Sequence, residues 1–242
     1  MDLEARLPSR QRWGFAAVGM AAGVIGLASS VLLDLSRLDR GRLVADSALI
    51  VRLGSDHVEL FRWASLLDLF GSYLLMLPLA VYLRNSFHAE QPATVDIGTV
   101  AAVVFGVAGA TGAATWASAT PLIAAYARAS PGDRPYLAAI FAAAIRAGTA
   151  LWHFVEGPAA AVWFGCTALA TRHRWRGFAR YSAALTVAIA LGSAGTMVLP
   201  DATSSGPATL FFLPVAVWPV WLAIRIWRDD GIDCAPDAET TA

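Results

Sequence analysis

Stretches of about twenty residues without a charged side chain recur along this chain. The clearest are Trp13–Leu33, Ile97–Ala127, Tyr181–Pro200 and Ala202–Ile224. The hydrocarbon core of a bilayer is about 30 Å thick, so a helix needs about 20 apolar residues to cross it. The sequence therefore predicts several transmembrane helices.

Two further stretches have the same length but contain ionisable residues. Phe61–Leu83 includes Arg62 and Asp68, and Leu151–Thr171 includes His153 and Glu156. Counting both, we expect an all-α, polytopic transmembrane helix bundle of six spans. The expected spans are residues 13–33, 61–83, 97–127, 151–171, 181–200 and 208–227.

The composition agrees with this fold class. Apolar residues make up 57% of the 242, charged residues make up 15%, and the mean hydropathy is +0.56. A soluble domain carries about 25% charged residues. The chain therefore lacks the polar surface of a disordered protein, of a nucleic-acid binder or of most soluble enzymes.

The first apolar stretch has two interpretations. A basic flank and the small residues Ala28 and Ser30 are typical of a cleaved signal peptide. The stretch is longer than a typical signal-peptide core, however, and Leu32 and Leu33 continue it. Its length therefore favours a retained span.

The arginine distribution predicts the orientation, because cytoplasmic loops of membrane proteins are enriched in cations. All 18 cations are Arg, and with the N-terminus inside, ten fall in cytoplasmic segments and eight outside. The loop Arg172–Arg180 is densely basic, whereas Asp201–Pro207 has no cation. We expect both ends in the cytoplasm, with Trp13, Trp175 and Trp227 anchoring the inner interface.

The segments outside the spans are a tail at residues 1–12, an outer segment at 34–60 and an acidic tail at 229–242. Residues 45–51 are apolar but too short to span. They form either an interfacial helix or a solvated loop. The acidic C-terminal tail is expected to be disordered.

Small residues are spaced four apart on two predicted helices: Gly19 and Gly23, and then Gly106, Ala110, Ala114 and Ser118. Such residues let helix backbones approach closely in lipid. They either pack the helices of one protomer or form a homo-oligomer interface. Cys166 and Cys234 are too far apart in the predicted topology to meet, and no metal or cofactor motif is visible.

The ionisable residues within the spans carry most of the functional information. Each costs about 2.5–3.5 kcal/mol on insertion scales and usually faces the bundle interior. Asp68 lies in the second span, and His153 and Glu156 lie three residues apart on one face of the fourth. If that helix extends backwards, Arg146 lies on the same face two turns away.

Gly157-Pro158 follows this group directly. A proline has no backbone donor, so Pro158 leaves the carbonyl of Phe154 without its helical partner. A local break is therefore expected beside His153 and Glu156.

In the predicted topology, these ionisable groups lie in the outer half of the membrane. Hydroxyls on other helices lean the same way, Thr115 among them. The sequence therefore predicts a polar cavity that opens outward above an apolar floor. Its candidate ligand-binding residues are Asp68, Arg146, His153, Glu156 and Thr115.

Three roles remain open for this group. It forms a buried ion-pair network that fixes helix register, or it binds or transports a small apolar or amphipathic molecule, such as an isoprenoid. Alternatively, Asp68, His153 and Glu156 catalyse acid–base chemistry on a lipid or prenyl substrate. Small membrane-bound terpene cyclases have a similar size and embedded acids, although their acid-bearing helices do not align with this chain. A structural membrane partner without a ligand is a further alternative.

The region from residue 150 onward resembles a known family. The features that carry the likeness are the run Ala150–Pro158, the basic turn Arg172–Arg180, a helix containing Gly192, and Pro214–Trp221 followed by Arg225 and Arg228. Together they resemble an uncharacterised bacterial six-span integral membrane family, known as a domain of unknown function. The resemblance implies six spans in a bacterial-type cytoplasmic membrane. It implies no catalytic residues, because none are established for that family.

Overall fold

The structure, a computed structural model, describes residues 9–36, 58–198 and 208–228. The predicted interfacial segment at 45–51 and the acidic tail at 229–242 lie outside these ranges. Every regular element in the described ranges is helical: α1 (Ser9–Leu35), α4 (Val58–Asp68), η1 (Leu69–Leu74), α5 (Met76–Phe87), α6 (Pro92–Arg128), α7 (Arg134–Leu151), η2 (Trp152–Glu156), α8 (Gly157–Thr171), α9 (Arg176–Val198) and α10 (Ala208–Arg228).

These elements form six rods in the described part of the chain. α4, η1 and α5 make one continuous rod, and α7, η2 and α8 make another, because η1 and η2 are π-helical segments within longer helices. Four rods are long and apolar enough to cross a membrane: Gln11–Leu35, Val58–Phe87, Pro92–Arg128 and Arg134–Thr171. The prediction of an all-helical fold is confirmed for the described residues, and these four rods support the prediction of a membrane protein.

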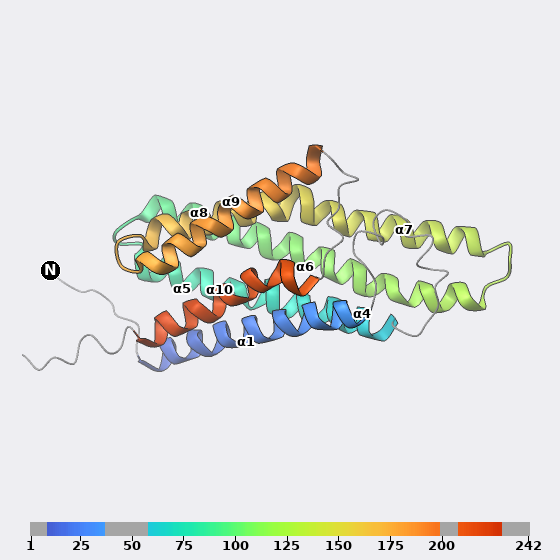
Figure 1. Cartoon of the computed structure of the whole chain (residues 1–242), viewed down its shortest axis with the longest axis horizontal. Coiled ribbons are helices and arrows are strands. Elements are labelled where there is room, and N and C mark those ends of the chain that lie inside the picture. The colour runs from blue at the N-terminus through green and yellow to red at the C-terminus, as the bar shows by residue number, and fades with distance from the viewer. Residues whose placement is uncertain (1–8, 37–57, 199–207, 229–242) are drawn as a thin grey trace, which may run out of the picture.

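The rods run along the long axis of the molecule (Figure 1). α6 packs against both composite rods, α1 packs along α10 and α4, and α9 packs along α8. The start of α1 and the end of α10 lie at the same end of the bundle (Figure 1). This end, which also contains the α8–α9 connection, is called the basic end below, because it carries Arg10, Arg12, Arg84, Arg172, Arg174, Arg176, Arg180, Arg225 and Arg228.

The α6–α7 hairpin projects beyond the other helices at the opposite end (Figure 1). α6 has 37 residues and the rod Arg134–Thr171 has 38. At 1.5 Å per residue each rod is about 55 Å long, well above the roughly 30 Å of a hydrocarbon core. The fourth rod therefore begins at Arg134, far ahead of the expected span at 151–171.

Two groups of buried side chains hold the rods together. The larger group includes Met76, Leu79, Phe105, Trp163, Phe164 and Trp218 and lies toward the basic end. The smaller group joins α1, α4, α6 and α7 through Leu33, Phe61, Trp116, Phe141 and Ile145. Large apolar side chains elsewhere remain exposed, such as Val100 and Val107 on α6 and Leu191 on α9. Outward-facing apolar residues of this kind suit contact with lipid.

The tryptophans at the basic end differ from one another. Trp13 and Trp227 are both 56% exposed, with ring centroids 6.0 Å apart, so both suit the predicted interfacial belt. Trp175 is 3% exposed and packs edge-on against Phe87. The expectation that Trp175 anchors the interface is therefore wrong, because its ring belongs to the core.

The predicted small-residue contacts form within the chain at Gly19 and Gly23. A Cβ atom on Gly19 would lie 2.7 Å from the carbonyl oxygen of Pro219 and 3.0 Å from the Cβ of Ala223 on α10. One on Gly23 would overlap Val220 on the same helix. These glycines therefore allow α1 and α10 to approach closely.

Replacing Gly23 with leucine should force α1 away from α10. We expect Gly23→Leu to lower the free energy of unfolding by about 1–3 kcal/mol, which is the usual cost of overpacking. Thermal unfolding in detergent micelles, followed by circular dichroism, measures the effect. Gly14→Leu is the matched control, because a Cβ there meets nothing within 4 Å. Equal melting temperatures for the two variants would contradict the prediction.

Candidate functional site

Asp68 is buried at the junction of α4 and η1. Its exposed fraction is 6%, and carboxylates are rarely buried to this extent. It ends α4 and immediately precedes the first residue of the π-helical segment. The second rod thus changes its backbone hydrogen-bonding pattern directly after its buried acid.

The fourth rod shows the same association. His153 and Glu156 lie within η2, and both side chains are half-buried. The wide turns are closed by bonds over five residues: Leu75 N–H donates to the Phe70 carbonyl at 3.0 Å, and Gly157 N–H donates to the Trp152 carbonyl. Single π turns inside α-helices are frequently found at functional sites.

Both π segments precede a proline. The carbonyls of Leu74 and Phe154 would normally accept from the residue four positions later. Those positions hold Pro78 and Pro158, which have no N–H. The expected break beside His153 and Glu156 therefore takes the form of a π turn.

A hydrogen bond joins the two π segments. The Tyr73 hydroxyl donates to Oε2 of Glu156 at 3.3 Å, linking side chains 83 residues apart in sequence. Tyr73 is 4% exposed. The contact brings the second and fourth rods together beside the ionisable groups that the sequence singled out.

Two glycines on α6 make room for this contact. A Cβ atom on Gly109 would overlap the Tyr73 ring, and one on Gly112 would lie 2.5 Å from Nε1 of Trp152. Trp152, the first residue of η2, donates from Nε1 to the Gly109 carbonyl at 3.2 Å. One aromatic ring from each π segment therefore packs against a glycine of α6.

The structure brings some predicted residues together and separates others. Glu156 lies against Tyr73, and Asp68 belongs to the same rod as Tyr73. Arg146 is exposed, so its face of α7 is not buried with the acids. The expectation that His153 and Glu156 share one face of the helix assumed α-helical geometry. A π turn holds more residues, so side chains three apart are rotated further from one another.

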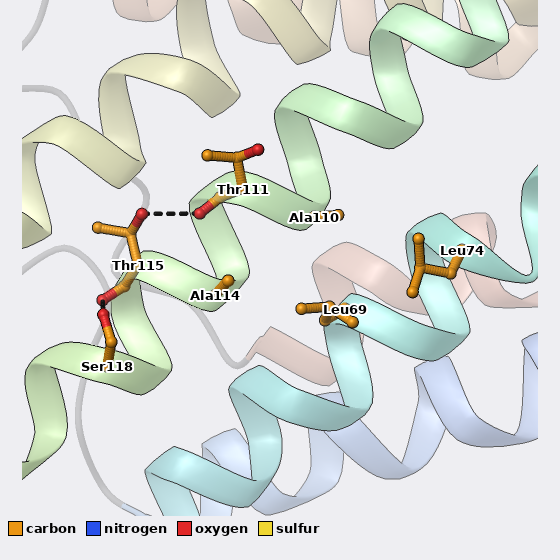
Figure 2. A pocket seen from close by; sticks show the side chains of 7 residues that line it. All are labelled: Leu69, Leu74, Ala110, Thr111, Ala114, Thr115 and Ser118. Carbon is orange, nitrogen blue, oxygen red and sulfur yellow. Dashed lines mark hydrogen bonds between the residues drawn. The ribbon is translucent and has the colours of Figure 1, made fainter.

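Thr115 lies in a different feature, an open groove between η1 and α6. The groove has a volume of about 570 Å³ and is lined by Leu69, Leu74, Ala110, Thr111, Ala114, Thr115 and Ser118. Leu69 and Leu74 face α6 across it (Figure 2). Leu69 is the residue after Asp68, so the groove borders the segment that carries the buried acid.

The hydroxyl protons along the groove are already used. Thr111 donates to the Val107 carbonyl at 2.7 Å, Thr115 to the Thr111 carbonyl at 2.7 Å, and Ser118 to the Thr115 carbonyl at 2.9 Å. Two of these bonds are drawn in Figure 2. The surface offered to a ligand is therefore mainly methyl groups and leucine side chains, which suits an apolar chain.

Sequence reasoning missed Tyr73, Trp152, Gly109 and Gly112. The available signal was the pair of glycines three apart on the third span, together with an aromatic residue near each acid-bearing stretch. Within the described ranges, no three His, Cys, Asp or Glu side chains come close enough to hold a metal ion. No family model, curated protein or solved structure matches the chain.

The Tyr73–Glu156 bond can be measured by a double-mutant cycle. We expect Tyr73→Phe and Glu156→Met to be coupled by about 0.6 kcal/mol, the average for side-chain hydrogen bonds between membrane helices, and by at most about 1.7 kcal/mol. Reversible unfolding in mixed micelles gives the four free energies.

Tyr73→Phe with Asp96→Asn is the control pair. Asp96 lies near the start of α6, more than three turns from Gly109, and pairs with Arg84 at 2.7 Å. Because these sites are distant, their effects should add. Coupling no larger in the Glu156 cycle than in this control would show that the bond does not form.

Proposed function

We propose that this chain is a six-span integral membrane protein of a bacterial-type cytoplasmic membrane, with both ends in the cytoplasm. α9 and α10, of 23 and 21 residues, have the length of a span and lie along the other rods. The start of α1 and the end of α10 lie together at the basic end, which agrees with an even number of crossings (Figure 1). Membership of the resembled bacterial family remains part of the proposal.

The charge distribution supports the orientation. Nine of the thirteen described Arg residues lie at the basic end, and Arg62, Arg128, Arg134 and Arg146 lie toward the other end. The positive-inside rule places the basic end on the cytoplasmic side. The projecting α6–α7 hairpin then extends outward, which gives exposed Arg146 access to water or headgroups.

Cysteine accessibility tests this orientation. In a background with Cys166→Ser and Cys234→Ser, a cysteine replacing exposed Ser130 in the α6–α7 connection should react with a membrane-impermeant maleimide added to intact cells. A cysteine replacing exposed His173 in the α8–α9 connection should react only after permeabilisation. The reverse pattern would overturn the proposed orientation, and reaction of both sites in intact cells would overturn the six-span topology.

The function that the site supports best is binding or transport of a small apolar or amphipathic molecule. The observation that carries it is the groove of about 570 Å³ between η1 and α6. The groove is shallow and open on one side, so a ligand there would lie between η1, α6 and the surrounding lipid. Its apolar walls suit the tail of a lipid or isoprenoid, and Asp68 directly precedes the lining residue Leu69.

The two π segments provide a route from ligand to conformational change. Leu69 and Leu74 line the groove, and Tyr73 in the same segment bonds Glu156 in the neighbouring rod. A ligand that displaces η1 therefore strains or breaks this bond. Movement between the rods would follow ligand binding, as a transporter requires.

A second candidate is an intramembrane acid–base enzyme acting on a lipid or prenyl substrate. The observation that favours it is the pairing of a half-buried carboxyl group, Glu156, with a phenol, Tyr73, near the buried Asp68. Such a group is able to deliver or accept a proton within an apolar site.

A photoreactive ligand tests the groove. A diazirine-bearing isoprenoid alcohol should label peptides that contain Leu69–Leu74 and residues 110–118. Ala114→Phe fills the groove and should reduce this labelling severalfold. Val100→Phe, on an exposed position of the same helix outside the groove, is the control.

Recovery of the unphotolysed ligand separates the two candidates. Chemically unchanged ligand favours binding or transport. Conversion that is lost in Glu156→Gln, while labelling persists, favours the enzyme. Equal labelling of Ala114→Phe and the unmodified protein would overturn the groove as the ligand site.

A further inference from the structure

α9 and α10 are joined near the basic end by polar and aromatic contacts. Trp218 Nε1 donates to the Ser182 hydroxyl at 2.9 Å, and the rings of Tyr181 and Trp221 lie 5.2 Å apart. Phe178 completes the contact, 5.3 Å from the Trp218 ring. This packing fixes the position of the next side chain toward the end of α10.

That side chain is Arg225, one turn after Trp221. Its Nε atom is buried and makes no hydrogen bond to the described residues. Its guanidinium faces Gly177 on α9, where a Cβ atom would lie 3.9 Å from Nη2. A Cβ at position 177 would also lie 3.5 Å from the Trp221 ring, and Gly177 is exposed, so the guanidinium is approached from outside past a backbone without a side chain.

The surroundings of Arg225 add positive charge. Arg176 and Arg180 on α9 and Arg228 on α10 are exposed. The described acids at this end are Glu90 and Asp96, which belong to the α5–α6 corner. Asp96 already accepts from Arg84 at 2.7 Å and lies 3.6 Å from Nδ1 of His88. A cluster of this kind between membrane helices fits an anionic headgroup.

We propose that α9 and α10 bind an anionic phospholipid at the basic end. Arg225 contacts the lipid phosphate, since a guanidinium presents a planar set of donors suited to phosphate oxygens. Arg176 and Arg180 flank the same phosphate from α9. The absence of a side chain at the exposed Gly177 lets the headgroup approach the guanidinium from outside.

A membrane lipid is favoured over a free anion by what lies beyond the cluster. Exposed apolar side chains continue along both helices, Val187 and Leu191 on α9 and Leu213 and Val217 on α10. Acyl chains would lie against these residues while the phosphate remains at the helix ends. This inference rests on the proposed membrane location, but it depends neither on the orientation nor on the groove ligand.

Lipid adducts of the purified full chain test the proposal. Native mass spectrometry in detergent compares phosphatidylglycerol, phosphatidylcholine and inorganic phosphate. We expect adducts with phosphatidylglycerol in excess of phosphatidylcholine, and none with phosphate alone. Arg225→Gln should weaken phosphatidylglycerol binding about fivefold, the effect of one cation near a membrane surface.

Two variants distinguish lipid binding at a defined site from attraction to the overall positive charge of the basic end. Gly177→Leu retains every charge but fills the space before Arg225, so it should also weaken phosphatidylglycerol binding. Arg172→Gln removes one exposed cation from the same end, away from Gly177, and should leave binding nearly unchanged. Circular dichroism and gel filtration confirm that each variant is folded.

Three results would overturn the proposal. Equal binding of the two lipids would exclude recognition of the anionic headgroup. Equal losses in Arg225→Gln and Arg172→Gln would reduce the effect to general charge attraction. Unchanged binding in Arg225→Gln would show that Arg225 does not contact the lipid phosphate. None of these results would alter the cysteine-accessibility test of topology.

Discussion

The requirement that each backbone polar group be bonded within its own helix governs this structure. A bilayer core offers no water to an unbonded carbonyl, and each such group costs several kcal/mol. Pro78 and Pro158 each remove a donor from a long apolar rod. The rods respond with the π turns η1 and η2, and each continues as one helix rather than ending at the break.

The ionisable residues gather at these same turns. Asp68 directly precedes η1, while His153 and Glu156 lie inside η2. A wide turn changes the direction in which the following side chains point, and this allows Tyr73 to reach Glu156. The meeting also depends on α6, because any side chain at Gly109 would occupy the position of the Tyr73 ring. The Tyr73–Glu156 contact therefore depends both on the π turns and on the close packing of α6 at Gly109.

The sequence predicted the helical class well, because charge-free length is a local property. It also located the break beside Glu156, since a proline removes its donor regardless of the fold. The matching break before Pro78 follows from the same rule but was not anticipated.

What could not be predicted depends on tertiary pairing. Tyr73 has no unusual sequence context, and only its approach to Glu156 distinguishes it. Arg146 was assigned to the polar face by ideal α spacing. Arg146 lies instead on the exposed side of α7. The predicted residues therefore do not form one group, because Glu156 contacts Tyr73, Thr115 lines the groove and Arg146 is at the surface. The cycle and labelling experiments test the roles proposed for the predicted acid and groove residues.

Energetic comparison bears on whether the acids only fix helix register. A charged residue within a span costs about 2.5–3.5 kcal/mol on insertion scales, whereas a side-chain hydrogen bond between membrane helices contributes about 0.6 kcal/mol on average and at most about 1.7. The Tyr73–Glu156 bond, at 3.3 Å, is one contact of Glu156, and by itself it contributes less than the cost of a charge in a span. The half-buried Glu156, inside a π turn and bonded to Tyr73, therefore fits a register-fixing network as well as the ligand and proton roles proposed above.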